Sequence, residues 1–164
     1  MSSNPVLLEF THTIWNALMA DLSKAGRGVR ESGAFLLGTH TQGRRQVHAS
    51  LPYGEVDPPS LNYGIIRLSP DAFPRVWGRC GELGLEVVAD IHTHPCGPHQ
   101  SSSDRAYPMI SIPGHLGLIA PRFAVDKVTT QDVSLNRYLG GGRWESFLGA
   151  SAAARIQLVT AYES

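Results

Sequence analysis

The apolar residues follow a helical period in two stretches of the chain. Between residues 13 and 24 they recur at the spacing of one helix face, and Gly26 and Gly28 are predicted to end that helix. A second helix is predicted to begin at Ser69, whose side chain can cap a first turn that contains a proline. The apolar face predicted for this second helix consists of Phe73, Trp77, Cys80 and Leu83.

Apolar runs of strand length occupy much of the remaining chain. Residues 85–94, LEVVADIHTH, are mostly apolar at successive positions, which is typical of a strand buried on both faces. Segment 54–60, GEVDPPS, is expected to form a proline-stiffened loop. The predicted strands are residues 6–10, 31–40, 45–53, 63–68, 85–94, 115–121, 132–139, 143–147 and 154–159. This order predicts a mixed α/β sandwich, and the length predicts a single domain over residues 1–164.

The overall charge is balanced, with 14 Lys and Arg against 14 Asp and Glu, so composition gives no indication of a nucleic-acid partner. Cys80 and Cys96 are too few for a disulfide framework, and we expect both to be reduced. The first residues lack a signal-peptide pattern, and no apolar run reaches the ~18 residues that a membrane helix needs. We therefore expect a cytoplasmic protein without a membrane partner.

Residues 89–104, ADIHTHPCGPHQSSSD, concentrate groups that bind metals or move protons. His92 and His94 are two positions apart in a predicted strand, so their side chains leave the same face with Cα atoms ~6–7 Å apart. Pro95 ends the strand, and SSSD is predicted to start a helix that returns Asp104 toward the histidines. Two imidazoles and one carboxylate can hold Zn²⁺ and leave its fourth position open, as catalytic zinc sites require.

The same residues allow a purely structural interpretation. Ser101 and Asp104 have the spacing of a capping box, in which the two side chains satisfy the first turn of a helix without a metal. Glu31, Glu55 and Glu86 are candidate proton acceptors, and Glu31 is the most suggestive because it stands at the start of an apolar strand. A strand-end glutamate in solvent is the alternative.

Together, ESGAFLLG at 31–38 and HTHP…SSSD at 92–104 resemble the JAMM motif of the MPN/JAB-domain (MPN+) metalloproteases. These are zinc isopeptidases that remove ubiquitin or ubiquitin-like proteins. The resemblance covers roughly residues 10–147 and includes a helix before each motif strand. It implies an α/β fold of the MPN/JAB (cytidine-deaminase-like) type, a mixed β-sheet flanked by helices.

The resemblance also implies a role for each matching residue. His92, His94 and Asp104 would bind Zn²⁺, and Glu31 would take a proton from the attacking water and pass it to the leaving amine. Residues 95–103 separate His94 from Asp104, one position fewer than is usual in the family. Ser101, as the serine of Ser-x-x-Asp, would donate a hydrogen bond to the oxyanion, and the shorter spacing leaves Ser102 as the alternative.

Three further residues near the motif are not assigned as ligands. His99 and Cys96 are expected to lie in the loop after the histidine strand, outside the ligand set. His115 follows a Pro-Gly turn. Two alternatives are open for it: it has no part in the site, or it contacts the substrate or one of the ligand residues.

The resemblance implies a deubiquitinase-like zinc metallopeptidase. Such an enzyme would cleave the amide bond after the C-terminal glycine of a ubiquitin-like protein, in a conjugate or a linear precursor. The implied context is a bacterial ubiquitin-like conjugation system with activating and conjugating enzymes, for example in antiviral defence. Two alternatives are a zinc peptidase or amidase for a small substrate, since only segment 54–62 could serve as a clamp, and a catalytically silent MPN scaffold.

Overall fold

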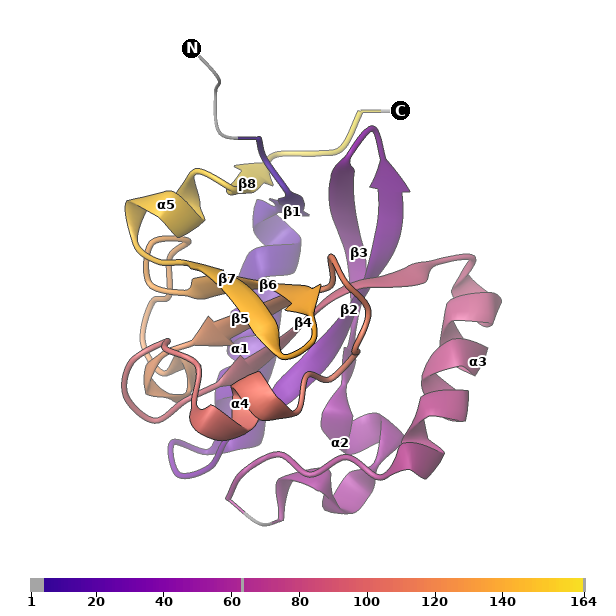
Figure 1. The fold of residues 1–164 in the computed structure, drawn as a ribbon, viewed down its shortest axis with the longest axis vertical. Coiled ribbons are helices and arrows are strands. Elements are labelled where there is room, and N and C mark those ends of the chain that lie inside the picture. The colour runs from indigo at the N-terminus through magenta and orange to yellow at the C-terminus, as the bar shows by residue number, and fades with distance from the viewer. Residues whose placement is uncertain (1–4, 63, 164) are drawn as a thin grey trace.

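The computed structural model describes residues 5–62 and 64–163, which form one curled, eight-stranded mixed sheet with helices on both faces (Figure 1). The strand order is β7-β6-β5-β4-β2-β3-β1-β8. The strands are β1 Leu8–Thr11, β2 Gly33–Thr41, β3 Arg44–Pro52, β4 Glu86–Thr93, β5 Leu116–Ala120, β6 Ser134–Gly140, β7 Arg143–Phe147 and β8 Ile156–Val159. The helices are α1 His12–Gly26, α2 Tyr53–Val56, α3 Phe73–Leu83, α4 Ser102–Ala106 and α5 Ala150–Ala153, with 3-10 turns η1 Pro58–Leu61, η2 Pro70–Ala72 and η3 Arg122–Ala124. The α/β prediction is confirmed.

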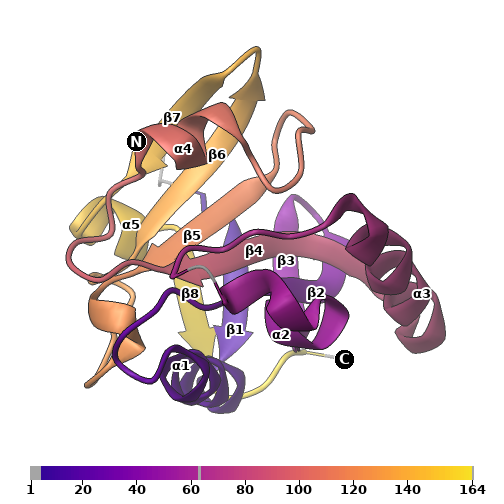
Figure 2. The same cartoon turned by 90° about the horizontal axis from the view of Figure 1, so that it is seen from below.

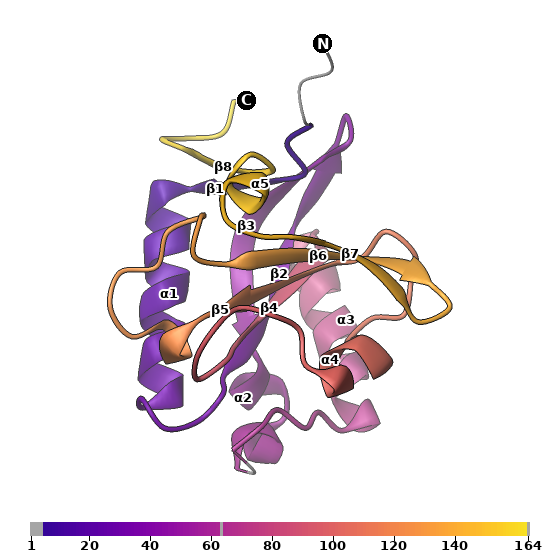
Figure 3. The same cartoon turned by 60° about the vertical axis from the view of Figure 1, so that its left-hand side comes forward.

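Helix α1 covers one face of the sheet, as its sequence period predicts. The Thr11 side chain accepts a hydrogen bond from the Ile14 N–H at the start of the helix, and Arg27 ends it in a left-handed conformation. Trp15 and Leu18 are buried on the face that packs against the sheet. The sheet lies between α1 and α3 (Figure 3), so it has an apolar core on each side.

The opposite face corrects two predictions about residues 54–68. Segment 54–60 is not an open loop, because it belongs to α2 and η1, where Val56 and Leu61 are buried. Residues 64–68 do not form a strand, and Tyr63 of that prediction lies outside the described residues. This segment makes isolated backbone bonds, from Arg67 N to Ser60 O and from Glu31 N to Gly64 O, instead of a ladder. Ile65 and Ile66 line the cavity described below, and Leu68 packs against the apolar core on the α3 side of the sheet.

The segment predicted as a helix from Ser69 begins with the 3-10 turn η2, so α3 itself starts only at Phe73, and it buries a different face. Ser69 caps the preceding turn η2 by accepting a hydrogen bond from the Asp71 N–H. The buried residues are Val76 and Cys80, whereas Trp77 is 50% exposed and Leu83 is 48% exposed. The predicted apolar face was therefore wrong in part, because only a narrow stripe of this helix touches the sheet.

The central strand β4 determines where the polar residues of the 89–104 segment lie. It pairs with β2 in the antiparallel direction and with β5 in the parallel direction, and its middle residues are buried. Gly33 on β2 lies opposite His92, and Ile119 on β5 pairs with it from the other side. Since both edges of β4 are hydrogen-bonded, its side chains cannot change face without breaking two ladders.

Within the described residues, no helix is both long and apolar enough to span a membrane.

Gly38 tests how tightly the β2–β3 pair is packed. The register shifts between Leu37 and Gly38, and a Cβ on Gly38 would overlap the carbonyl group of Gln46. We expect Gly38→Ala to lower the free energy of unfolding by about 3 kcal/mol, because the backbone of β3 must move. Gly78→Ala is the control, since its Cβ meets no atom within 4 Å. It lies in an exposed part of α3 and should raise stability by about 0.5–1 kcal/mol. Urea denaturation measures both, and equal stability of the two variants would contradict the packing argument.

Candidate metal centre

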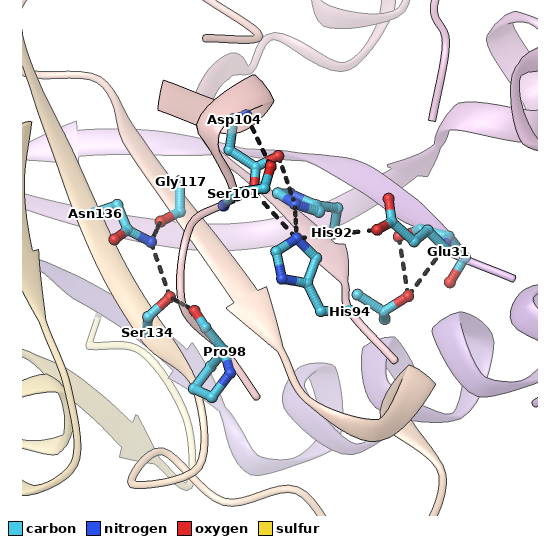
Figure 4. A network of polar contacts seen from close by, with 11 residues as sticks. Glu31, His92, His94, Pro98, Ser101, Asp104, Gly117, Ser134 and Asn136 are labelled. Carbon is cyan, nitrogen blue, oxygen red and sulfur yellow. Dashed lines mark hydrogen bonds and ion pairs between the residues drawn. The ribbon is translucent and has the colours of Figure 1, made fainter. Parts of the chain in front are cut away.

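His92, His94 and Asp104 meet at the end of β4, where each offers one atom that can bind a metal (Figure 4). The two Nε2 atoms of the histidines are 3.0 Å apart. Asp104 Oδ2 lies 3.0 Å from His94 Nε2, and its Oδ1 lies 3.3 Å from His92 Nε2. The ligand atoms of all three residues lie within 4.8 Å of one another. The convergence predicted from the spacing of these residues is therefore present in the structure.

The backbone beyond β4 holds His94 in place. Its N–H donates to Ala120 O at 2.9 Å, and its carbonyl accepts from Phe123 N at 2.9 Å. These bonds continue the β4–β5 pairing past Thr93, the last residue of β4. The second histidine consequently remains on the face of the first although Pro95 ends the strand.

Asp104 is both a helix cap and a member of the histidine cluster. Its Oδ2 accepts from the Ser101 N–H at 2.8 Å, while the Asp104 N–H donates to Ser101 Oγ at 3.0 Å. These two bonds form a complete capping box at the start of α4. The structural and metal-binding interpretations of SSSD are thus compatible, because a carboxylate has enough lone pairs for the backbone and for a ligand.

Glu31 precedes β2 and faces the histidines. Its Oε1 lies 4.0 Å from His94 Nε2, and its side chain is only 17% exposed. The next residue, Ser32, fixes this position: its N–H donates to Thr93 Oγ1, and its carbonyl accepts from Thr93 N. The other two candidate bases are not near the histidines, because Glu55 is an exposed residue of α2 and Glu86 lies at the opposite end of β4.

The cluster shifts the proton affinities of its members in opposite directions. Burial raises the pKa of Glu31, and the positive charges of His92 and His94 offset this only in part. Burial would also raise the pKa of Asp104, but hydrogen bonds from both histidines hold it far below its usual range. For His94, the penalty of burial is outweighed by the hydrogen bond and charge of Asp104, so its pKa is raised.

The donor set fits a divalent metal that prefers nitrogen and oxygen ligands. Two imidazole nitrogens in such close contact need either a shared proton or a cation between them, and the Asp104 carboxylate adds the negative charge. A set of three ligands made of two neutral imidazoles and one carboxylate suits Zn²⁺. Glu31 is close enough to act on a group bound there without being one of the three clustered ligands.

A cavity of about 180 Å³ opens beside the cluster and contains Glu31, His92, Asp104 and Ser101 in its lining. Ser102 is not among the described residues that line it, so the geometry favours Ser101 over Ser102 as the serine that reaches a bound group. Cys96 is exposed and His99 lies in the loop, both outside the cluster of three ligands, as expected.

Asp90 was not among the site residues predicted from the sequence, and the position of His115 was left open. His115 is buried, and its Nε2 lies 2.5 Å from Asp90 Oδ2. Asp90 is two positions before His92 on β4, and it lines the same cavity. Asp90 could have been predicted from the sequence, because alternate residues of a strand share one face and Asp90 is therefore on the same face as His92 and His94.

No family model matches this chain. A solution structure of a protein from Desulfitobacterium hafniense is similar, with a TM-score of 0.66, 16% sequence identity and 96% of each chain covered. A solution structure of a protein from Salinibacter ruber has a TM-score of 0.58 and 21% identity over 84% of this chain and 86% of that one. These comparisons establish that the two proteins share the α/β fold of this chain.

The opposed pKa shifts predict how metal binding depends on pH. Because the pKa of His94 is raised, its contribution to stability in the metal-free protein is complete below about pH 6.5 and is lost as pH rises through the folded-state value. The pKa of Asp104 is lowered, so its contribution is present above about pH 3.9 and is lost only in acid. A metal must displace the His94 proton. We therefore expect Zn²⁺ to raise the midpoint of thermal unfolding more at about pH 7.5 than at about pH 5.5.

Differential scanning fluorimetry with and without Zn²⁺ measures this effect. His94→Gln should abolish the zinc-dependent shift, whereas the control Glu55→Gln should keep it. A shift that is independent of pH, or one that survives in His94→Gln, would contradict the assignment of the ligands.

Proposed function

We propose that this protein is a zinc metallopeptidase of the JAMM type with an MPN/JAB fold. It would cleave the amide bond that follows the C-terminal glycine of a ubiquitin-like protein. The observation that carries the proposal is the meeting of Glu31 with His92, His94 and Asp104, at the distances given above, beside a cavity that Ser101 also lines. The mixed α/β sheet is consistent with this fold, and the family itself is part of the proposal.

His92, His94 and Asp104 would hold the zinc ion. When bound at such a site, Zn²⁺ polarises a carbonyl group and lowers the pKa of a water molecule to ~7. The two histidines bind in their neutral form, and Asp104 contributes the negative charge. The capping box keeps the Asp104 carboxylate in position, since it ties the side chain to the Ser101 backbone.

Glu31 is suited to move the proton. Its carboxyl group lies at the edge of the histidine cluster, and burial raises its pKa toward the operating pH, which favours a general base. It would accept a proton from the attacking water and then deliver it to the departing amine nitrogen. The Ser32–Thr93 bonds hold Glu31 beside β4 during both steps.

Ser101 is suited to donate a hydrogen bond to the developing oxyanion. Its Oγ accepts a bond from the Asp104 N–H, which uses a lone pair and leaves the hydroxyl proton available. One such donor contributes on the order of 3 kcal/mol to the stability of a transition state.

A second candidate is a zinc peptidase or amidase for a small substrate. Segment 54–62 does not project as a clamp, because Val56 and Leu61 are buried in the core between α2, α3 and the sheet. The cavity of about 180 Å³ is also small. The resemblance of the motif is the basis for proposing a ubiquitin-like substrate with activating and conjugating enzymes as partners. The size of the cavity favours the small substrate instead.

Replacement of the proposed base should separate catalysis from metal binding. We expect Glu31→Gln to lower kcat by about 10²–10⁴, because the amide cannot accept the proton, while zinc content stays at one ion per chain. A ubiquitin-like protein fused after its terminal glycine to a reporter serves as substrate, and elemental analysis measures zinc. Glu55→Gln, which changes an exposed carboxylate in the same way, should cleave like the unaltered protein.

Two outcomes would contradict this proposal. Equal cleavage by Glu31→Gln would remove Glu31 from the mechanism, and a purified protein without zinc would indicate a scaffold.

The two adjacent serines provide a matched pair. Ser101→Ala should lower kcat by about 10²–10³ through loss of the oxyanion donor. It should also lower the free energy of unfolding by ~1 kcal/mol through loss of the cap. Ser102→Ala should leave both quantities nearly unchanged. Kinetics on the same fusion and urea denaturation test this, and a larger loss of kcat in Ser102→Ala would reverse the assignment.

A further inference from the structure

The cavity extends past the proposed zinc ligands to a second group of polar residues. Asp90, Tyr53, Met109 and Trp144 also line it. None of these four residues has a role in the mechanism above. The Trp144 ring is held in place because its Nε1 donates to Arg105 O in α4, next to the β7 strand (Figure 2).

Asp90 is a buried carboxylate that one partner holds in position. His115 Nε2 contacts its Oδ2 at 2.5 Å, and the side chains of His115 and Asp90 are 6% and 9% exposed. A buried pair of this kind contributes little net stability, because desolvation offsets the attraction. The second oxygen of Asp90, Oδ1, makes no hydrogen bond within the described part of the chain.

A glycine leaves space at this second oxygen. Gly117 pairs with Asp90 across the β4–β5 ladder, and a Cβ there would lie 3.5 Å from Oδ1. That distance is ordinary van der Waals contact, so a side chain would fit without strain, but it would cover the carboxylate. The absence of a side chain at Gly117 therefore keeps Oδ1 open to the cavity that both residues line.

Tyr53 adds a buried polar group that has no partner among the described residues. It is fully buried, and its hydroxyl makes no hydrogen bond to the described residues. Burial raises its pKa well above 10, with further contributions from Asp90 and Asp104, so the group remains a neutral phenol. An unpaired buried hydroxyl is unfavourable, and a ligand that hydrogen-bonds to it removes that penalty.

The charges and ring systems around the cavity point to a cation. Its described lining includes three carboxylates, from Glu31, Asp90 and Asp104, and no lysine or arginine. Zinc would neutralise the charge of the ligand cluster, which leaves Asp90 for another positive group. The ring of Trp144 and the phenol of Tyr53 complete a lining that suits an ammonium ion.

We propose that Asp90, oriented by His115 and left accessible by Gly117, is a binding site for a primary ammonium group of the substrate. This inference rests on the proposed amide hydrolysis and names a substrate class for it. The substrates would be amides that carry a positively charged amino group close to the bond that is cut. The cavity of about 180 Å³ accommodates a short aminoalkyl chain. Asp90 thereby determines specificity and takes no part in the proton transfers.

Binding of n-butylammonium tests the site without any turnover. The zinc-loaded protein is titrated at pH 7 with n-butylammonium and with 1-butanol, which has a similar size and no charge, and amide and indole N–H shifts are followed by NMR. We expect n-butylammonium to bind about tenfold more tightly than 1-butanol, because a charge-assisted hydrogen bond is much stronger than a neutral one. The shifts should centre on Gly117 and Trp144.

Two variants locate the binding site. Gly117→Ala should weaken n-butylammonium binding about tenfold while it leaves zinc content and 1-butanol binding unchanged, because a methyl group then covers Asp90 Oδ1. Asp90→Asn should have the same effect, and Gly117→Ala decides the matter where Asp90→Asn fails to fold. Gly78→Ala and the exposed Asp21→Asn are the matched controls and should bind like the unaltered protein.

Equal affinity for the two probes, no binding of n-butylammonium, or unchanged binding by Gly117→Ala would each overturn the ammonium site. These results do not depend on catalysis. The ammonium site can therefore fail while Glu31→Gln still abolishes cleavage, and it can be confirmed in a protein that cleaves nothing.

Discussion

The pairing of β4 on both of its edges is the constraint on which the polar site depends. An antiparallel ladder to β2 and a parallel ladder to β5 fix which side chains of β4 face α1 and which face the cavity. Asp90 and His92 share the cavity face, and the backbone bonds of His94 extend the same pairing by one more residue. A strand with a free edge could slip by one position and turn these groups into the apolar core.

Asp104 joins this strand to the short helix α4. A five-residue helix has little stability of its own, and the capping box together with the contact to His92 and His94 offsets that weakness. The negative charge of Asp104 is acceptable in a partly buried position because two imidazoles and the Ser101 N–H surround it. Helix geometry and site geometry are therefore linked through one side chain.

The cavity contains two kinds of polar group with different physical roles. Glu31 and Ser101 lie next to the ligand cluster, where the proposed hydrolysis would use them. Asp90 and Tyr53 are more deeply buried, and the Tyr53 hydroxyl has no hydrogen-bond partner among the described residues. A buried hydroxyl without a partner is costly, and the proposed ammonium site would place a ligand beside that of Tyr53.

The sequence by itself determined the local features. The period of α1, the buried run of β4, the shared face of His92 and His94 and the cap at Ser101 each depend on residues close together in the chain. Only the tertiary structure decided which long-range neighbours complete the site: Glu31 beside His94, His115 against Asp90, and the space over Gly117. Residues 64–68 and the buried face of α3 were misjudged for the same reason. Hydrophobic pattern specifies a period and a face, whereas strand order and the packing of distant segments specify what that face meets.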